Sequence, residues 1–327
     1  MSLTTLFRRS PATIEAESPT LAGFHGGIVP LSTLRVEVQG APDAPVLVVL
    51  GGISASAHVA AHADDPSPGW WEAIVGPGRV IDPARYRIVS IDWLTVPGHP
   101  VDARDQARAL GVALDRLGVA TVEAIIGASY GGMVALAFAT LFPARVGQLI
   151  VLSAAPESHP MATALRTIQR GVVRLGIKSG RAHEAVALAR ALGIASYRTA
   201  EEFAERFAAA PVRTATGYRF PVEEYLEHGG TRFAIRCEAE RYLALSESID
   251  LHRVDPAEIT TPITLLAVEG DQLVPVWQVH ELFGRLGGPG RVVEITSRYG
   301  HDAFLKEVEA VSELLTTALE RRARHAA

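Results

Sequence analysis

The sequence predicts an α/β fold, in which a mostly parallel, doubly wound sheet carries an all-helical insertion. Short apolar runs rich in Val, Ile and Leu recur without strict alternation, which is typical of strands buried on both faces of a parallel sheet. Helical patterns alternate with these runs, as in a doubly wound sheet. The strands are expected at residues 34–38, 46–50, 87–91, 122–126, 149–152, 263–268 and 292–295.

Helical spacing of apolar residues predicts the elements between these strands and a long helical segment after the fifth strand. The helices between strands are expected at residues 104–117, 131–142, 277–286 and 303–319. Those of the segment are expected at residues 161–175, 183–195, 200–209, 222–228 and 232–246. We therefore expect a core of residues 1–155 and 252–327 and a helical lid of residues 156–251. Such lids often line a pocket and control access to it, although a role in dimer contact alone is the alternative.

Composition excludes several classes of protein. The chain has 327 residues, a net charge of −5 and a pI of about 6.1, so no global basic field would attract nucleic acid. No apolar run approaches the roughly 20 residues that span a bilayer, and no signal-peptide core is visible near the start. A single cysteine, Cys237, rules out an intramolecular disulfide. We expect a cytoplasmic enzyme without nucleic-acid or membrane partners.

The most informative stretch is a turn of small residues after the expected strand 122–126. Ser129 lies between Gly127 and Gly131, and a helical pattern begins directly afterwards. A tight strand-to-helix turn requires small neighbours and raises the serine hydroxyl above the sheet edge. The helix N-terminus behind it favours developing negative charge. The pattern therefore predicts a nucleophilic serine, against the plainer interpretation of a glycine-rich turn with an idle serine.

A serine nucleophile needs a base that removes its proton and an acid that orients the base. In this architecture the acid and then the histidine follow the serine in the chain, each after a late strand. Asp271 follows the strand 263–268 and His301 follows the strand 292–295. Their order and placement predict the triad Ser129, Asp271 and His301 on an α/β-hydrolase fold. The rivals, which lack this placement or lie closer to a strand body, are His25, His99, His159 and Glu269.

An acyl-transfer site must also stabilise a tetrahedral oxyanion. One donor should be the backbone N–H after the nucleophile, that of Tyr130, and the other should come from the loop after an early strand. That loop begins with Gly51-Gly52 after the strand 46–50, and the N–H of Ile53 is the candidate. An ordinary Gly-Gly turn is the alternative interpretation.

Several segments resemble the homoserine O-acyltransferases of the MetX type, and the resemblance covers most of the chain. The segment 299–305 resembles the histidine motif of that family and is the most specific match. The other matching segments are residues 127–133 at the nucleophile, 52–59 in the oxyanion loop, and 222–226 with 242–243 in the lid.

The resemblance implies residues for the acceptor substrate. Arg190 and Tyr197 match the residues that hold the homoserine carboxylate, and Asp302 matches the residue that engages the amino group. A spacing of seven would place Arg190 and Tyr197 on one helix face, and an arginine fork suits a carboxylate. Without the resemblance, the plainer interpretations are a surface arginine and tyrosine, and an N-cap aspartate.

The implied activity is ping-pong transfer of an acyl group from acyl-CoA, as co-substrate and without a cofactor, to L-homoserine in methionine biosynthesis. A lid that fixes the acceptor would let it reach the acyl-enzyme before water. Compact members with stretches similar to residues 69–72 and 75–78 resemble those assigned to succinyl transfer, so succinyl-CoA is favoured over acetyl-CoA. A serine acceptor, a plain esterase and a non-catalytic binding protein are the alternatives.

Two departures from the family concern the acyl donor. Longer members carry a further Gly-rich segment where this chain has residues 92–100, and Tyr130 stands where methionine is common. Both changes are expected at the donor site. The distal carboxylate of a succinyl group needs a cation, for which Arg166 and Arg170 are candidates, although solvated helix charges are the equal alternative. No metal-ligand cluster or dinucleotide motif is visible, and the family implies a homodimer joined through the lid helices.

Overall fold

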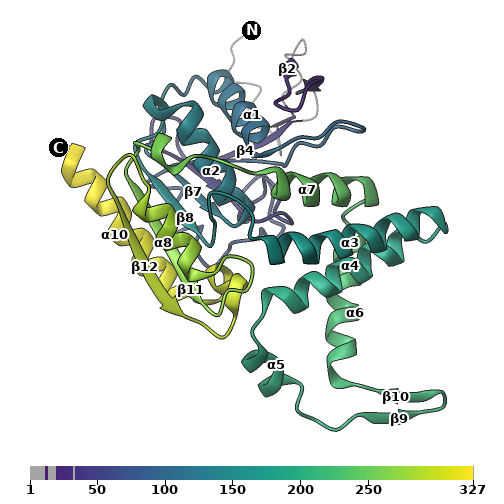
Figure 1. Ribbon diagram of the computed structural model, residues 1–327. Coiled ribbons are helices and arrows are strands. Elements are labelled where there is room, and N and C mark those ends of the chain that lie inside the picture. The colour runs from purple at the N-terminus through teal and green to yellow at the C-terminus, as the bar shows by residue number, and fades with distance from the viewer. Residues whose placement is uncertain (1–11, 14–19, 32–33, 327) are drawn as a thin grey trace.

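A central sheet of eight strands organises the molecule in the computed structural model, which describes residues 12–13, 20–31 and 34–326 (Figure 1). The strand order is β1-β4-β6-β5-β7-β8-β11-β12, and all neighbours from β6 to β12 are parallel. At one edge, β4 runs antiparallel to both of its neighbours, β1 and β6. The mostly parallel sheet that the sequence predicts is therefore confirmed. The strands are β1 (Ala12–Thr13), β4 (Arg35–Gln39), β5 (Val46–Leu50), β6 (Arg87–Ile91), β7 (Ala124–Ala128), β8 (Leu149–Leu152), β11 (Ile263–Glu269) and β12 (Gly290–Thr296).

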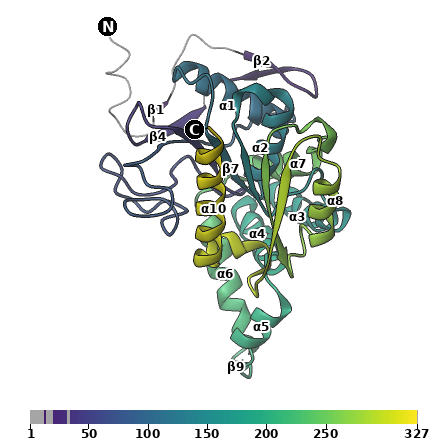
Figure 2. The ribbon, with the colours of Figure 1, turned by 90° about the vertical axis from the view of Figure 1, so that its left-hand side faces the viewer.

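Helices cover both faces of this sheet. Figure 2 shows α10 on one side of the sheet and α2 and α8 on the other. Two buried clusters correspond to these faces, one built around α1, α2 and α8, and the other around α10 and the loop that contains Trp71 and Ile81. The covering helices are α1 (Ala103–Arg116), α2 (Tyr130–Leu141), α8 (Val276–Gly284), α9 (Ala303–Lys306) and α10 (Val308–Ala326).

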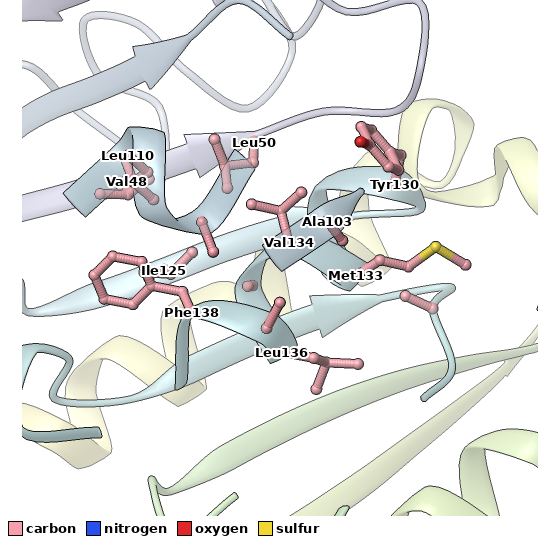
Figure 3. Packing of buried hydrophobic residues seen from close by; sticks show 14 of the residues in the cluster. Val48, Leu50, Ala103, Leu110, Ile125, Tyr130, Met133, Val134, Leu136 and Phe138 are labelled. Atoms are coloured by element: carbon pink, nitrogen blue, oxygen red, sulfur yellow. The ribbon is translucent and has the colours of Figure 1, made fainter. Parts of the chain in front are cut away.

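The helix α2 is fixed firmly behind the turn that carries Ser129. Ten of its residues are buried, and Val134 and Phe138 pack with Val48 and Ile125 of the adjacent strands (Figure 3). Complete burial of a side chain of this size contributes roughly 1.5–3 kcal/mol. The N-terminus of α2 is therefore a rigid support for the chemistry at the sheet edge.

Between β8 and β11 the chain leaves the sheet and forms a separate helical layer. Figure 1 shows α3, α4 and α6 projecting away from the sheet. A small apolar core, which includes Val173, Val186 and Tyr242, holds them together. The helices are α3 (Pro160–Lys178), α4 (Ala182–Tyr197), α5 (Ala200–Arg206), α6 (Pro221–Ala234) and α7 (Ala239–Leu251).

The expectation that residues 156–251 are all-helical is wrong. A hairpin of β9 (Val212–Thr214) and β10 (Gly217–Arg219) joins α5 to α6 at the far tip of the layer (Figure 1). Every residue of the two strands is exposed, so no alternation of buried and exposed side chains marks them in the sequence.

Other boundaries also differ from the sequence expectations. The last helix, expected over 303–319, is divided at Glu307, whose carboxylate accepts a hydrogen bond from the Ser297 hydroxyl at 2.7 Å. The strand β7 starts two residues later than expected and continues to Ala128. A small hairpin of β2 (Thr20–Ala22) and β3 (Ile28–Pro30) was not expected. None of the helices in the described part of the chain combines the length and apolar character of a bilayer-spanning helix.

Candidate active site

The turn between β7 and α2 holds Ser129 in a strained backbone conformation, with φ 53° and ψ −118°. A non-glycine residue in such a region costs of order 1–3 kcal/mol, and this strain persists only where the surroundings impose it. A Cβ on Gly127 would lie 2.3 Å from the Gly131 carbonyl oxygen, and one on Gly131 would lie 2.3 Å from the Leu50 carbonyl oxygen. The close approach of backbones therefore explains both glycines of the pattern.

The structure brings Ser129, His301 and Asp271 into one hydrogen-bonded chain. The Ser129 Oγ lies 2.8 Å from His301 Nε2, and His301 Nδ1 lies 2.7 Å from Asp271 Oδ2. The other carboxylate oxygen of Asp271 accepts the N–H groups of Leu273 and Val274 at 2.8 and 3.0 Å. The sheet causes this convergence, because the three side chains follow the carboxyl ends of β7, β11 and β12. The imidazole is therefore oriented to accept the serine proton.

Electrostatics around His301 favour its protonated form. Burial lowers the pKa of the imidazole, but the charge and hydrogen bond of Asp271 and the charge of Asp302 raise it, and the net shift is upward from 6.5. An imidazolium that forms when the serine loses its proton is thus stabilised by two carboxylates.

Two backbone N–H groups lie near Ser129 without an acceptor among the described residues, those of Ile53 and Tyr130. The loop that carries Ile53 is held at two points. The Gly131 N–H donates to the Gly51 carbonyl at 2.9 Å, and the Trp93 indole N–H donates to the Gly52 carbonyl at 2.9 Å. A loop fixed in this way and free N–H groups are what an oxyanion hole requires.

Arg190 and Tyr197 project from α4 into the cavity that contains Ser129 and His301. The Arg190 guanidinium donates to the Tyr197 hydroxyl at 3.3 Å and lies 4.9 Å from the centre of the Phe233 ring. The plainer interpretation of two surface residues is therefore wrong. The tyrosine ring also lies 5.8 Å from the His301 ring, so both helix residues border the reacting groups.

Asp302 also lines this cavity, and Arg198 holds it in place. Its Oδ2 lies 3.0 Å from Arg198 Nε, and its side chain makes no capping hydrogen bond at the start of α9. The N-cap interpretation therefore fails. Arg198 in turn donates to both carboxylate oxygens of Glu202 at 3.2 Å. Arg198 belongs to no motif in the sequence, and only the fold brings it to Asp302.

Arg166 and Arg170 are not solvated helix charges. Both side chains are largely buried and share one partner, Asp250, at 2.7 and 2.5 Å. Burial raises the pKa of Asp250, but the two guanidinium groups lower it by more. The net pKa is therefore below its usual value of 3.8, and the carboxylate is charged. Of the two arginines, Arg166 lines the cavity at Ser129. The sequence did not predict this role of Asp250, because the residue lies 80 positions after Arg170 and belongs to no motif.

The side chain of Tyr130 is placed differently from expectation. It is completely buried, shares a hydrogen bond of 2.5 Å with the Ser248 hydroxyl and packs edge-on against Trp93 at 4.8 Å. Neither it nor residues 92–100 line the cavity at Ser129. These side chains therefore do not border the cavity that contains the nucleophile. They support the loop and helix behind the serine instead.

Trp70 and Ser153 are among the further residues that line the cavity and that no sequence motif marks as site residues. Trp70 does so from the loop after β5, and its indole N–H donates to the Ser56 carbonyl at 3.1 Å. Ser153 follows β8 with φ 51°, and its buried hydroxyl has no hydrogen-bond partner. A positive φ at a serine leaves no signal in a single sequence.

Comparison with known proteins places these features in a family. Residues 45–308 match the model of the alpha/beta hydrolase fold. The chain is 45% identical to homoserine O-succinyltransferase of Xanthomonas campestris pv. campestris, over 88% of this chain and 78% of that protein. It is 34% identical to homoserine O-acetyltransferase of Thermus thermophilus, over 95% and 94% of the two chains. A serine O-succinyltransferase of Litchfieldella anticariensis is also 34% identical, over 90% and 95%.

Solved structures with lower sequence identity share the fold. The homoserine O-acetyltransferase of Bacillus anthracis superimposes with a TM-score of 0.83 at 18% identity, over 93% of this chain and 96% of that chain. The esterase E22 gives a TM-score of 0.82 at 20% identity, over 92% and 97%. Because transferases and esterases share this architecture, the fold by itself does not choose between them.

Proposed function

The chain belongs to the homoserine O-acyltransferases of the MetX type within the α/β-hydrolase fold, and on this premise we propose that it is a homoserine O-succinyltransferase. It transfers a succinyl group from succinyl-CoA to the hydroxyl of L-homoserine, in methionine biosynthesis. The observation that carries this proposal is a single cavity in which the chain Ser129–His301–Asp271 meets Arg190 and Tyr197. Acyl-CoA enters as a co-substrate, and the proposed reaction needs no cofactor.

The first half-reaction acylates the serine. His301 Nε2 accepts the proton as Ser129 Oγ attacks the thioester carbonyl, and the N–H groups of Ile53 and Tyr130 donate to the oxyanion. The carbon–sulfur bond then breaks, and His301 returns the proton to the CoA thiolate. The products of this step are free CoA and a succinyl ester on Ser129.

The second half-reaction transfers the acyl group to the acceptor. His301 removes the proton of the homoserine hydroxyl, whose oxygen attacks the ester, and the proton passes back to Ser129 Oγ as the ester bond breaks. Arg190 and Tyr197 bind the carboxylate of the amino acid. Asp302 binds the ammonium group of the amino acid while it remains paired with Arg198. These contacts place the hydroxyl at the ester before water can react.

The buried charges support succinyl-CoA over acetyl-CoA as donor. Arg166 and Arg170 together carry two positive charges and face the single carboxylate of Asp250, which leaves a net positive charge beside the cavity. The distal carboxylate of a succinyl group would complete the neutralisation through Arg166. An acetyl group offers no such partner, although the relative from Thermus thermophilus carries the acetyltransferase name.

We further propose that residues 156–251 act as the lid and that two copies join through it. Large apolar side chains on the outer surface of this segment are exposed and would be covered by such a contact; they are Ile168, Leu175, Leu188, Tyr218, Phe220 and Ile235. A cytoplasmic location is part of the same proposal and fits the biosynthetic names of the relatives.

The second candidate function is a serine esterase, since the esterase E22 shares the architecture. A thiol-release assay with purified protein separates the two candidate functions. It uses succinyl-CoA or acetyl-CoA, and each donor is tested with L-homoserine, with L-serine and without an amino acid. We expect sustained CoA release only with succinyl-CoA and L-homoserine together. Release at the same rate without any amino acid would contradict the transferase, and a preference for acetyl-CoA or L-serine would correct the donor or the acceptor.

A further inference from the structure

A cluster of side chains of the types that bind metals lies outside the cavity at Ser129. Glu37 comes from β4, and His58 and His62 come from the continuation of the loop that carries Ile53. One ligand atom from each of the three lies within 4.8 Å of the others. Glu37 is 5% exposed, and the two histidine side chains are 14% and 18% exposed. Glu37 is therefore buried, and the two histidines are partly buried.

The separations within this group match those of ligands around one metal ion. His58 Nδ1 lies 3.1 and 3.0 Å from the two carboxylate oxygens of Glu37, and His62 Nε2 lies 3.3 Å from Glu37 Oε1. Ligands bonded to tetrahedral Zn²⁺ at roughly 2.0–2.1 Å are about 3.3 Å apart. The distances from the two histidines to Glu37 are therefore close to those between ligands of one ion.

Outer hydrogen bonds orient two of the ligands. His58 Nε2 lies 2.7 Å from the Ser67 carbonyl and donates to it, so Nδ1 is the ring nitrogen that faces Glu37 and would be free to bind a metal once it loses its proton. The Gln39 side-chain amide donates to Glu37 Oε1 at 3.0 Å. Metal-binding histidines usually donate their second N–H to a carbonyl or carboxylate in this manner. A cation bound here would take the place of the Nδ1 proton between His58 and Glu37.

An independent observation concerns the third ligand. His62 Nε2 is buried and has no hydrogen-bond partner, because its approach to Glu37 lacks the geometry of a hydrogen bond. A buried polar atom without a partner is costly, and a missing ion is one explanation for it. Asp65 Oδ2 lies 3.8 Å from His58 Nδ1 and is the nearest side chain for a fourth position.

We propose that Glu37, His58 and His62 bind one divalent transition-metal ion, for which Zn²⁺ suits the two imidazoles and the carboxylate. His62 ligates through Nε2 with its proton on Nδ1, so the contact of 3.3 Å from the Asp64 N–H to Nδ1 opens. The site departs from the expectation, drawn from the sequence, of no metal ligands. It is independent of the proposed acyl transfer, since it contains no group of the cavity at Ser129.

The ion has a structural role in this proposal. It ties β4 to the loop that leads from Ile53 to His62, which a hydrogen bond from the Ala57 N–H to Asp92 Oδ1 at 2.6 Å also anchors. Binding to the folded state alone stabilises that state by mass action. The melting temperature should therefore rise with added Zn²⁺ and fall after chelation.

The test uses the untagged full chain, dialysed against a chelator and then titrated with Zn²⁺ by calorimetry, with metal content measured after gel filtration. We expect about one Zn²⁺ per chain, and affinity reduced in Glu37→Gln and in His62→Ala by more than the roughly 10- to 100-fold that follows removal of an outer partner of a ligand. The matched control is His280→Ala, because His280 also pairs with a glutamate, Glu294 at 2.8 Å, but lies on the surface. Cobalt substitution provides a second readout, since tetrahedral Co²⁺ absorbs visible light strongly.

Each outcome decides the proposal. The site is supported if Glu37→Gln still folds, as checked by circular dichroism, but loses Zn²⁺ binding. Wild-type protein that binds no Zn²⁺ overturns it, as does equal loss of binding in His280→Ala. If His62→Ala fails to fold, the visible spectrum of cobalt-loaded Glu37→Gln still decides, because an unchanged spectrum would exclude Glu37 as a ligand.

Discussion

The sheet core and the helical segment 156–251 contribute to one cavity in different ways. In the core, Ser129, Asp271 and His301 each follow the carboxyl end of a strand, so the pairing of strands fixes where they meet. In the segment, Arg190 and Arg166 come from helices that are held by a small core of their own. The comparison teaches that the reacting groups depend on the sheet, whereas the groups proposed to select substrates depend on helix packing.

The largest effect should come from the core. Ser129→Ala removes the nucleophile, and we expect acyl transfer to fall by roughly 10⁴-fold or more, with no acyl-enzyme detectable by intact-protein mass spectrometry. Ser153→Ala is the matched control, because it removes a hydroxyl from the same cavity that is not bonded to a base. A Ser129→Ala protein that still accumulates a succinyl adduct would disprove the assignment of the nucleophile.

A change in the segment should separate the two half-reactions. Arg190→Ala removes the proposed partner of the acceptor carboxylate, so transfer to L-homoserine should fall about 10- to 100-fold while acylation of Ser129 is nearly unchanged. Rapid-quench measurement of the acyl-enzyme follows both steps. Arg181→Ala, on the exposed start of the same helix, is the control. Equal loss in both steps would remove the distinction between the two regions.

The donor preference should respond to Arg166. Arg166→Leu removes the charge of the one arginine of the Arg166–Arg170 pair that lines the cavity, and the ratio of kcat/KM for succinyl-CoA over acetyl-CoA should fall roughly tenfold. Arg174→Leu on the exposed side of α3 provides the control for helix and charge. An unchanged ratio would mean that the distal carboxylate is bound elsewhere.

The site could be predicted from the sequence to the extent that local rules govern it. The order of Ser129, Asp271 and His301 after predicted strands follows from the topology of a parallel sheet, which the apolar runs reveal. The pairs Arg198–Asp302 and Tyr130–Ser248 depend on how separate elements pack, and no local pattern encodes that packing. The hairpin β9–β10 was missed because its exposed residues carry no periodic burial.

Asp302 connects the electrostatics of the two regions. The pKa of His301 is raised above 6.5, and the enzyme needs the neutral imidazole, so kcat/KM for acylation should fall as the pH drops through this raised pKa. Asp302→Asn removes one of the charges that raise it, so the acidic limb should move to lower pH. Arg198→Gln is the variant to compare with Asp302→Asn, because it removes the ion-pair partner of Asp302 but keeps the Asp302 carboxylate. A limb that stays in place in Asp302→Asn would exclude this coupling.

The smallest effect should come from the hydrogen bond that joins the regions directly. Tyr130 begins the core helix α2, and its hydroxyl meets Ser248 on α7, at 2.5 Å, in a buried environment. Tyr130→Phe should lower the free energy of unfolding by about 1 kcal/mol, measured by urea denaturation. The donor preference should not change, because this side chain does not line the cavity.

A double-mutant cycle determines whether this bond couples the core to the segment. If Tyr130 and Ser248 stabilise the protein only through each other, Ser248→Ala should cause almost no further loss in the free energy of unfolding in the Tyr130→Phe background. Fully additive losses would mean that the two hydroxyls do not stabilise the protein through each other and that this bond does not couple the two regions. A change in donor preference in either variant would instead return Tyr130 to the donor site, where the sequence alone had placed it.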